Sequence, residues 1–188
     1  MRRLIVQEFV SLDGLAAGPD GGVDFIPAAT SGDALLAENQ MRFIDTIDTI
    51  VLGRTTYEMF AGYWPTATGD DKPFADKLNA IPKLVFTKTL DRAPWGSFAE
   101  ATISKEDVRA EIPRLREQEG KDMVVWGSLS IVRSLAEAGL VDEYHLWLLP
   151  VALGGGTPLF AAGGSTSMEL LEAKTAEKGG VLLRYRPS

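Results

Sequence analysis

Short apolar runs rich in β-branched residues alternate with helical patterns along most of the chain. This alternation restricts the fold most, because a strand, a helix and the next strand connect most readily as a right-handed crossover between parallel strands. We predict strands at 3–10, 49–52, 83–87, 122–126 and 141–149, with a weaker one at 97–102. A closing hairpin at 168–177 and 181–186, turning at 178–180, adds antiparallel strands.

Helical patterns fill the gaps between these strands. One begins near Ser31 and carries Leu36, Phe43, Ile44 and Ile47 on one face. Shorter helices are expected at 55–60 and 74–79, and the segments 11–27 and 62–73 are expected as loops rich in Gly, Pro or aromatic residues. Ser104 with Asp107 resembles a capping box before a helix, and Gly139 is a plausible end for a helix after Ser128.

The composition of this 188-residue chain is that of a globular protein, and it disfavours several classes. With 26 acidic and 19 basic side chains, the net charge of −7 would oppose binding to nucleic acid. The chain has no cysteine for disulfides, thiol catalysis or thiolate metal sites. The single histidine, His145, lies in the middle of a strand, where we expect a structural role, so neither a Ser–His triad nor a metal centre is expected.

Targeting and membrane signals are also missing from the sequence. The apolar run that starts at Leu4 is interrupted by Gln7 and Glu8 and lacks a cleavage site, which disfavours a signal peptide. No stretch approaches the roughly 20 apolar residues of a spanning helix. We therefore expect one soluble, cytoplasmic α/β domain over residues 1–188, with a mostly parallel central sheet, helices on both faces and a C-terminal antiparallel hairpin.

Two common nucleotide motifs are absent, yet three strand ends carry groups that bind anions. Neither a Walker P-loop nor a Gly-x-Gly-x-x-Gly turn is present. The three ends are Gly53-Arg54-Thr55-Thr56, Thr87-Lys88 and Gly127-Ser128-Leu129. Ligands of open α/β sheets gather at the carboxyl ends of strands, where helix N-termini offer free N–H groups. The alternative is that Thr55 and Ser128 only cap helices, while Arg54 and Lys88 point into water.

With these strand ends in this order, the sequence resembles the dihydrofolate reductase-like superfamily. The resemblance is greatest to stand-alone proteins similar to the C-terminal reductase domain of the bifunctional riboflavin-synthesis deaminase-reductase. The resemblance spans nearly the whole chain. Its pieces are Ser11-Leu12-Asp13-Gly14, the segments 51–58, 81–87 and 125–128, and the segment from Ala138 to Phe160 that contains Gly154-Gly155-Gly156. It implies a three-layer dihydrofolate reductase-like sandwich.

The resemblance also implies the cofactor NADP(H). Arg54 and Thr56, beside Gly53 and Thr55, would contact phosphates, and Thr87 and Lys88 would surround the 2′-phosphate. The remaining expected contacts are backbone groups: those of Gly127, Ser128 and Leu129 at the pyrophosphate, and those of Val6, Leu15 and Ala16 at the nicotinamide. Two cations near the adenosine end would favour NADP over NAD, because the additional phosphate needs charged partners.

Two departures from the relatives bear on the substrate. Relatives often carry two glycines where this chain has Gly127-Ser128, and a cis peptide is frequent there, which makes Trp126-Gly127 a candidate cis bond. Riboflavin-pathway reductases typically have an acidic residue where Trp126 stands. The missing carboxylate argues against the ribosylaminopyrimidine substrate of those enzymes.

We therefore predict an NADPH-dependent reductase that transfers a hydride to a small, pterin- or pyrimidine-like heterocycle. Asp13 is the candidate for proton delivery or substrate orientation, and the alternative for it is an Asx-turn before Gly14. Asp24 and Phe25, after a flexible loop that could act as a lid, and the aromatic pair Tyr63 and Trp64 are the candidate substrate contacts. The alternative for the aromatic pair is a small core beneath the loop. The competing function is a non-catalytic NADP(H)-binding module or sensor.

A homodimer is predicted from the strand 141–149. Tyr144, Leu146 and Leu148 alternate there with Glu143, His145 and Trp147, so that an exposed Trp147 would form an apolar patch with Val151 and Leu153. A two-fold dimer is the usual way to cover such a patch, and the family resemblance points the same way. The alternative is that a loop or the closing hairpin covers Trp147 within one chain.

Overall fold

The computed structural model describes residues 1–160, 163 and 165–188. Its contacts divide the chain into two compact units, the first comprising Met1–Leu4 and Gln40–Leu140, the second Ile5–Asn39 and Val141–Ser188. The fold is α/β, with mostly parallel strand pairs and a C-terminal antiparallel pair, which confirms the predicted fold class. The single-domain organisation stays a prediction.

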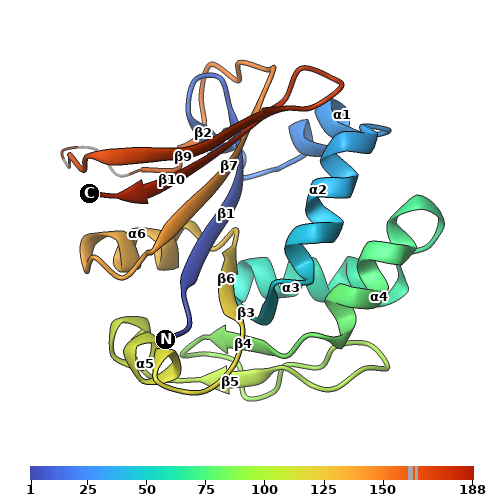
Figure 1. Cartoon of the computed structure of the whole chain (residues 1–188). Coiled ribbons are helices and arrows are strands. Elements are labelled where there is room, and N and C mark those ends of the chain that lie inside the picture. Colours follow the sequence, from blue (N-terminus) through green and yellow to red (C-terminus); the bar gives the residue numbers. More distant parts are fainter. Residues whose placement is uncertain (161–162, 164) are drawn as a thin grey trace. The chain divides into compact units, whose positions relative to one another are not determined.

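The first unit is built on four parallel strands. Their order is β5 (Thr102–Ser104), β4 (Lys83–Phe86), β3 (Ile47–Gly53) and β6 (Asp122–Trp126). Its helices are α3 (Arg54–Tyr63), α4 (Lys72–Ala80), α5 (Val108–Arg116) and α6 (Leu129–Glu137), and α2 (Ala34–Ile44) ends in this unit (Figure 1). Because the strands are parallel, their carboxyl ends lie at the same edge.

The core of the first unit explains why β3 reads as a continuous apolar run. Ile50, Val51 and Leu52 are fully buried, as expected for a central parallel strand that is covered on both faces. Lys83 is also buried, and its ammonium group donates to the carbonyls of Leu78 and Asn79 at 2.7 and 2.8 Å. These two bonds satisfy carbonyl groups at the C-terminal end of α4.

The larger sheet of the second unit combines one parallel and two antiparallel strand pairs among the described residues. β1 (Leu4–Ser11) runs parallel to β7 (Glu143–Leu149), and all of β1 except Leu4 belongs to the second unit. β7 pairs antiparallel with β10 (Val181–Pro187), and β10 with β9 (Met168–Thr175), the red pair in Figure 1. The short strands β2 (Leu15–Ala17) and β8 (Thr157–Pro158) pair separately, and α1 (Phe25–Thr30) follows β2.

Asp33 fastens the start of α2 to the hairpin turn within the second unit. Its buried carboxylate accepts hydrogen bonds from the backbone N–H groups of Leu36, Glu177 and Lys178 at 3.0, 3.2 and 2.8 Å. Burial acts to raise the pKa of Asp33, but these N–H groups outweigh it and lower the pKa below its usual value.

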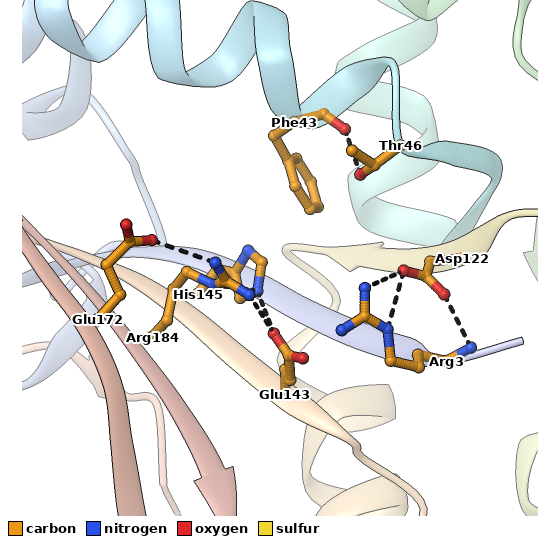
Figure 2. A network of polar contacts seen from close by, with 8 residues as sticks. All are labelled: Arg3, Phe43, Thr46, Asp122, Glu143, His145, Glu172 and Arg184. Carbon is orange, nitrogen blue, oxygen red and sulfur yellow. Dashed lines mark hydrogen bonds and ion pairs between the residues drawn. The ribbon is translucent and has the colours of Figure 1, made fainter.

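A polar row crosses the sheet of the second unit, and it includes the only histidine. Arg184 donates to Glu143 at 2.9 Å, to Glu172 at 3.1 Å and to the His145 ring at 3.1 Å, as Figure 2 shows. His145 also lies 2.9 Å from Glu143, and both side chains are buried. His145 thus belongs to a partly buried network of polar contacts, which favours its predicted structural role.

Several element boundaries differ from the sequence predictions. The loop expected at 11–27 contains β2 and the start of α1, and the loop at 62–73 contains two 3-10 turns and the first residues of α4. The strand expected at 97–102 is wrong, because that segment forms only a bridge between Trp95 and Phe98 and the strand follows at β5. Such short pairings depend on tertiary partners, which local sequence does not reveal.

Two helix predictions also need correction. Ile47 belongs to β3 instead of the helical face of α2, which ends at Ile44. Asp107, not Ser104, is the N-cap of α5, since its carboxylate accepts from the N–H of Arg109 at 2.9 Å. The predicted C-terminal signal after α6 is correct: Gly139 is left-handed, and the N–H groups of Gly139 and Leu140 bond the carbonyls of Ala136 and Leu135.

The predicted exposure of Trp147 is wrong. Its side chain is 1% exposed and packs with Leu36 of α2 and Leu182 of β10 inside the second unit. Val151 packs against the same cluster, so this face of β7 is covered within one chain. The apolar patch that supported a dimer through Trp147 therefore does not exist.

Candidate functional site

The candidate site of the first unit lies at the carboxyl ends of its strands. β3 ends at Gly53 and α3 begins at the next residue, while β6 ends at Trp126 and α6 begins at Leu129. The N–H groups of Arg54, Thr55, Leu129 and Ser130 have no hydrogen-bond partner within the described part of the chain. First-turn N–H groups of this kind, with the helix dipole behind them, attract anions.

Ser128 joins the two turns at this edge. Its hydroxyl accepts from the N–H of Gly53 at 2.8 Å and donates to the carbonyl of Trp126 at 3.2 Å. Its own N–H donates to the hydroxyl of Thr56 at 2.9 Å. The sequence prediction brought Gly53, Thr56 and Ser128 to one place correctly, but it missed that the Ser128 N–H is already engaged within the chain.

Gly127 is required by the same packing. It has a left-handed backbone with φ of +55°, and a Cβ atom there would lie 2.9 Å from both the Cγ2 and Oγ1 atoms of Thr56. A glycine is needed for both reasons, because other residues adopt this conformation at a cost and the space is already filled. The Trp126-Gly127 bond is not cis, since the described residues contain no cis peptide.

The two predicted cations lie on the surface of the first unit. Arg54 is about half exposed and pairs with Glu58 one turn along α3 at 3.2 Å. Lys88 is exposed and donates to the carbonyl of Lys105, while the adjacent Thr87 is buried. The Thr87 hydroxyl accepts from the N–H groups of Thr89 and Leu90, which shapes the turn after β4. Weak exposed contacts leave both cations available to a phosphate.

Asp13, in the second unit, holds a glycine-rich loop. Its carboxylate accepts from the hydroxyl of Ser11 at 2.6 Å and from the N–H groups of Gly154 and Leu153 at 2.7 and 3.1 Å. The Ser11 hydroxyl, followed by these two N–H groups, lowers the pKa of Asp13 to about 2. An ionised carboxylate has no proton to deliver at neutral pH, so only the orienting part of the predicted role remains, as a proposal.

The loop beside Asp13 is also tied to β2. β2 pairs with β8, and the N–H of Leu159 donates to the carbonyl of Gly14 at 3.2 Å. A Cβ atom on Gly156 would lie 2.1 Å from the carbonyl oxygen of Ala17, so only glycine allows this approach. Leu15 and Ala16, the predicted nicotinamide contacts, therefore belong to a firmly bonded pair of loops.

The third predicted nicotinamide contact is in a different setting. Val6 is fully buried in the middle of β1, opposite Tyr144. The predicted contact is made by its backbone and stays a prediction.

The predicted substrate residues divide between the two units. In the first, Trp64 packs against Phe60 and Phe74, with ring centroids 6.1 and 5.4 Å away, which favours its alternative role in the core. Tyr63 is half exposed, and its hydroxyl donates to Asp71. In the second unit, Phe25 packs against the cluster around Trp147, and Asp24 is exposed.

The expected lid is a compact turn. Gly18 and Gly22 are joined by a 2.8 Å backbone bond, and the N–H of Gly22 donates to the Asp20 carboxylate at 2.9 Å. Its predicted movement stays a prediction.

Comparison with known proteins places the chain in a family. The family model of the RibD C-terminal domain matches residues 2–182. The chain belongs to the RibD C-terminal domain family. The protein YyaP of Bacillus subtilis strain 168, whose function is uncharacterised, is 28% identical over 98% of this chain and 94% of its own length.

Solved structures agree on the fold of this family member. A Shewanella sp. PV-4 protein described as a riboflavin biosynthesis protein superposes with a TM-score of 0.76 at 21% identity, covering 99% of both chains. Dihydrofolate reductase from Enterococcus faecalis, solved in complex with NADP(H), superposes with a TM-score of 0.59 at 15% identity, covering 99% of this chain and 96% of that one. The predicted dihydrofolate reductase-like fold is confirmed.

Within the described residues, no group of three or more His, Cys, Asp or Glu side chains could hold a metal ion. None of the helices that the structure describes is long and apolar enough to cross a membrane.

Proposed function

We propose that this protein is an NADPH-dependent reductase that passes a hydride to a small heterocyclic acceptor. The observation that carries the proposal is the carboxyl edge of the first unit, where two helix N-termini with unpartnered N–H groups are held together by Ser128. This arrangement is suited to a pyrophosphate, because its donors are fixed before the ligand arrives. Membership of the RibD C-terminal domain family supports the same chemistry.

The residues of the first unit fit the phosphates of such a cofactor. The Thr56 hydroxyl accepts from Ser128 and, among the described residues, donates to no other group, so its proton is available to a phosphate oxygen. Arg54 and Lys88 would bind the 2′-phosphate through charge-assisted hydrogen bonds. When bound, NADPH supplies the hydride, and the chain supplies binding and orientation.

The proposed acceptor is an uncharged heterocycle of the pterin or pyrimidine kind, without the ribosyl phosphate of the riboflavin pathway. Trp126 stands where the riboflavin-pathway reductases typically carry an acid. Its indole is buried and packs against Phe43, Phe60 and Phe74, with ring centroids 6.1–6.4 Å away. A carboxylate at this position would lose that packing, so the aromatic residue belongs to the core and provides no polar contact for that substrate.

The cofactor test is a titration of NADPH and NADH followed by cofactor fluorescence. NADPH should bind more tightly, and Arg54→Ala should weaken NADPH by about 1.5–3 kcal/mol, the range for losing a hydrogen bond to a charged group, and NADH by less. Arg114→Ala, which removes another exposed arginine of the first unit, is the matched control and should change neither. NADH binding as tight as NADPH would contradict the assignment of Arg54 and Lys88.

The reaction test follows NADPH absorbance with a panel of quinones, pterins and pyrimidines. Oxidation of NADPH by one acceptor class supports the reductase. Tight NADPH binding without turnover of any acceptor supports the competing function, a binding module or sensor. Turnover of the riboflavin-pathway pyrimidine at about 1–1000 per second, the usual range for enzymes, would contradict the assignment of Trp126.

We also propose a homodimer in the cytoplasm, with a different surface from the one first expected. β9 pairs on one side with β10 and carries Leu170 and Leu171, which are 52% and 38% exposed. A strand at a sheet edge that exposes two leucines can pair with a second copy. In an antiparallel pairing of two β9 strands centred between residues 171 and 172, Glu169 of each copy would face Lys174 of the other.

A further inference from the structure

Ser128 has a backbone conformation that serine rarely adopts. Its φ and ψ are 56° and 46°, and it is the one residue other than glycine with positive φ among those that the structure describes. Side chains in this left-handed region are held there at a free-energy cost, which persists where neighbouring contacts determine the conformation. At Ser128 those contacts can be named.

The hydroxyl and the N–H of Ser128 both form hydrogen bonds at the two strand ends. The hydroxyl receives the Gly53 N–H and donates to Trp126, and the N–H donates to Thr56. Gly53 is the N-cap residue of α3 and Ser128 that of α6, so the start of each helix is bonded to the start of the other. Neither N-cap has a side-chain capping bond of its own.

We propose that Ser128 is a positioning residue for the pyrophosphate of the dinucleotide, acting through Gly53 and Thr56. Its hydroxyl fixes the β3–α3 turn against the β6–α6 turn, which holds the free N–H groups of both helices in a set relation. Its N–H orients the Thr56 hydroxyl as a donor toward the ligand, and accepting that bond strengthens the donor. This inference rests on the proposed function of the site.

Replacing Ser128 by alanine or by glycine separates the effect of its hydroxyl from the effect of its left-handed backbone. Ser128→Ala removes the hydroxyl but keeps the unfavourable backbone conformation. Ser128→Gly removes the hydroxyl and relieves that conformation, so its thermal midpoint should stay closer to the wild type. If the hydroxyl acts by positioning, both variants lose affinity for the pyrophosphate whatever happens to their stability.

The experiment titrates wild type and variants with NADPH, NADH and inorganic pyrophosphate, and records thermal midpoints. Ser128→Ala and Ser128→Gly should each weaken both dinucleotides by about tenfold, the effect of losing one hydrogen bond, with the NADPH-to-NADH ratio unchanged. Ser134→Ala is the matched control, because its hydroxyl bonds only the Ser130 carbonyl on the exposed side of α6. It should bind as the wild type does.

A second pair of variants tests the path through Thr56. Thr56→Val keeps the side-chain volume but removes the oxygen that accepts the Ser128 N–H, and it should weaken both dinucleotides as Ser128→Ala does. Thr56→Ser keeps that oxygen and should restore the affinity. If Ser128 has only a structural effect, the loss of dinucleotide affinity should instead follow the loss in thermal midpoint from variant to variant.

The outcomes separate this inference from the proposed function. Wild-type affinity in Ser128→Ala and Ser128→Gly would overturn the inference and leave the proposed function intact. Pyrophosphate binding that weakens in these variants, with no dinucleotide binding by the wild type, would overturn the proposed function and keep Ser128 as a positioning residue for the anion. Failure of the wild type to bind either class would overturn both.

Discussion

Gly127 and Gly139 offer a matched pair for testing the packing at the candidate site. Both are in the first unit and both are left-handed, with φ of +55° and +65°. They differ in the space around a Cβ atom: at Gly127 it would meet Thr56 at 2.9 Å, whereas at Gly139 nothing lies within 4 Å. Replacing each glycine by alanine therefore separates the cost of conformation from the cost of the clash.

The expected magnitudes follow from these two terms. A left-handed alanine costs about 1–2 kcal/mol, and this is the only unfavourable term at Gly139. At Gly127 the added methyl also overpacks against Thr56, a further cost of about 1–3 kcal/mol. The difference between the two variants isolates the clash, because the smaller conformational freedom of alanine in the unfolded chain applies to both.

Urea unfolding followed by tryptophan fluorescence measures both variants, since Trp64, Trp95 and Trp126 all report on the first unit. The double variant Gly127→Ala with Thr56→Ser removes the Cγ2 contact and should recover part of the loss, which appears as a coupling energy. Equal losses in Gly127→Ala and Gly139→Ala would refute the reasoning. They would mean that Thr56 does not fill the space beside Gly127.

Three further predictions concern stability and assembly. Asp33→Asn should lower the free energy of unfolding of the second unit by about 1–3 kcal/mol at pH 7. Because folding lowers the pKa of Asp33, the difference in unfolding free energy between wild type and variant should be full well above pH 3.8 and shrink as the pH falls below that value. Urea unfolding across this pH range measures the difference. Lys83→Met should cost about 1–3 kcal/mol in the same assay at pH 7. The reason is that the Asn79 carbonyl loses its donor and the Leu78 carbonyl keeps only the N–H of Ile81. An unchanged midpoint would contradict this. Light scattering should give the wild type a mass of twice 20.3 kDa and Leu170→Lys the mass of a monomer. The control Met59→Lys, at an exposed apolar residue of α3, should stay a dimer. A wild-type monomer would contradict the dimer proposal.

The local sequence determined the elements whose signals are local. The run from Asp122 to Trp126 is short, apolar and β-branched, and β6 has those bounds. Gly139 follows the end of α6 as predicted, because its left-handed backbone lets its own N–H and that of Leu140 bond the last carbonyls of the helix. The order of strand ends and helix starts also sufficed to predict a mostly parallel sheet with Gly53, Thr56 and Ser128 at one edge, while the dihydrofolate reductase-like fold was predicted from the family resemblance.

Only the tertiary structure decided what distant residues do to one another. The alternation in β7 does not reveal that Leu36 and Leu182 cover Trp147, because burial depends on segments more than 30 residues away. Asp13 has the sequence signature of a turn, yet its carboxylate also binds the N–H groups of Leu153 and Gly154, 140 and 141 positions away. The Ser11 hydroxyl, and after it these two N–H groups, lower its pKa. The bond from Gly53 to Ser128 likewise spans 75 positions, so the joining of the two turns depends on the pairing of β3 with β6.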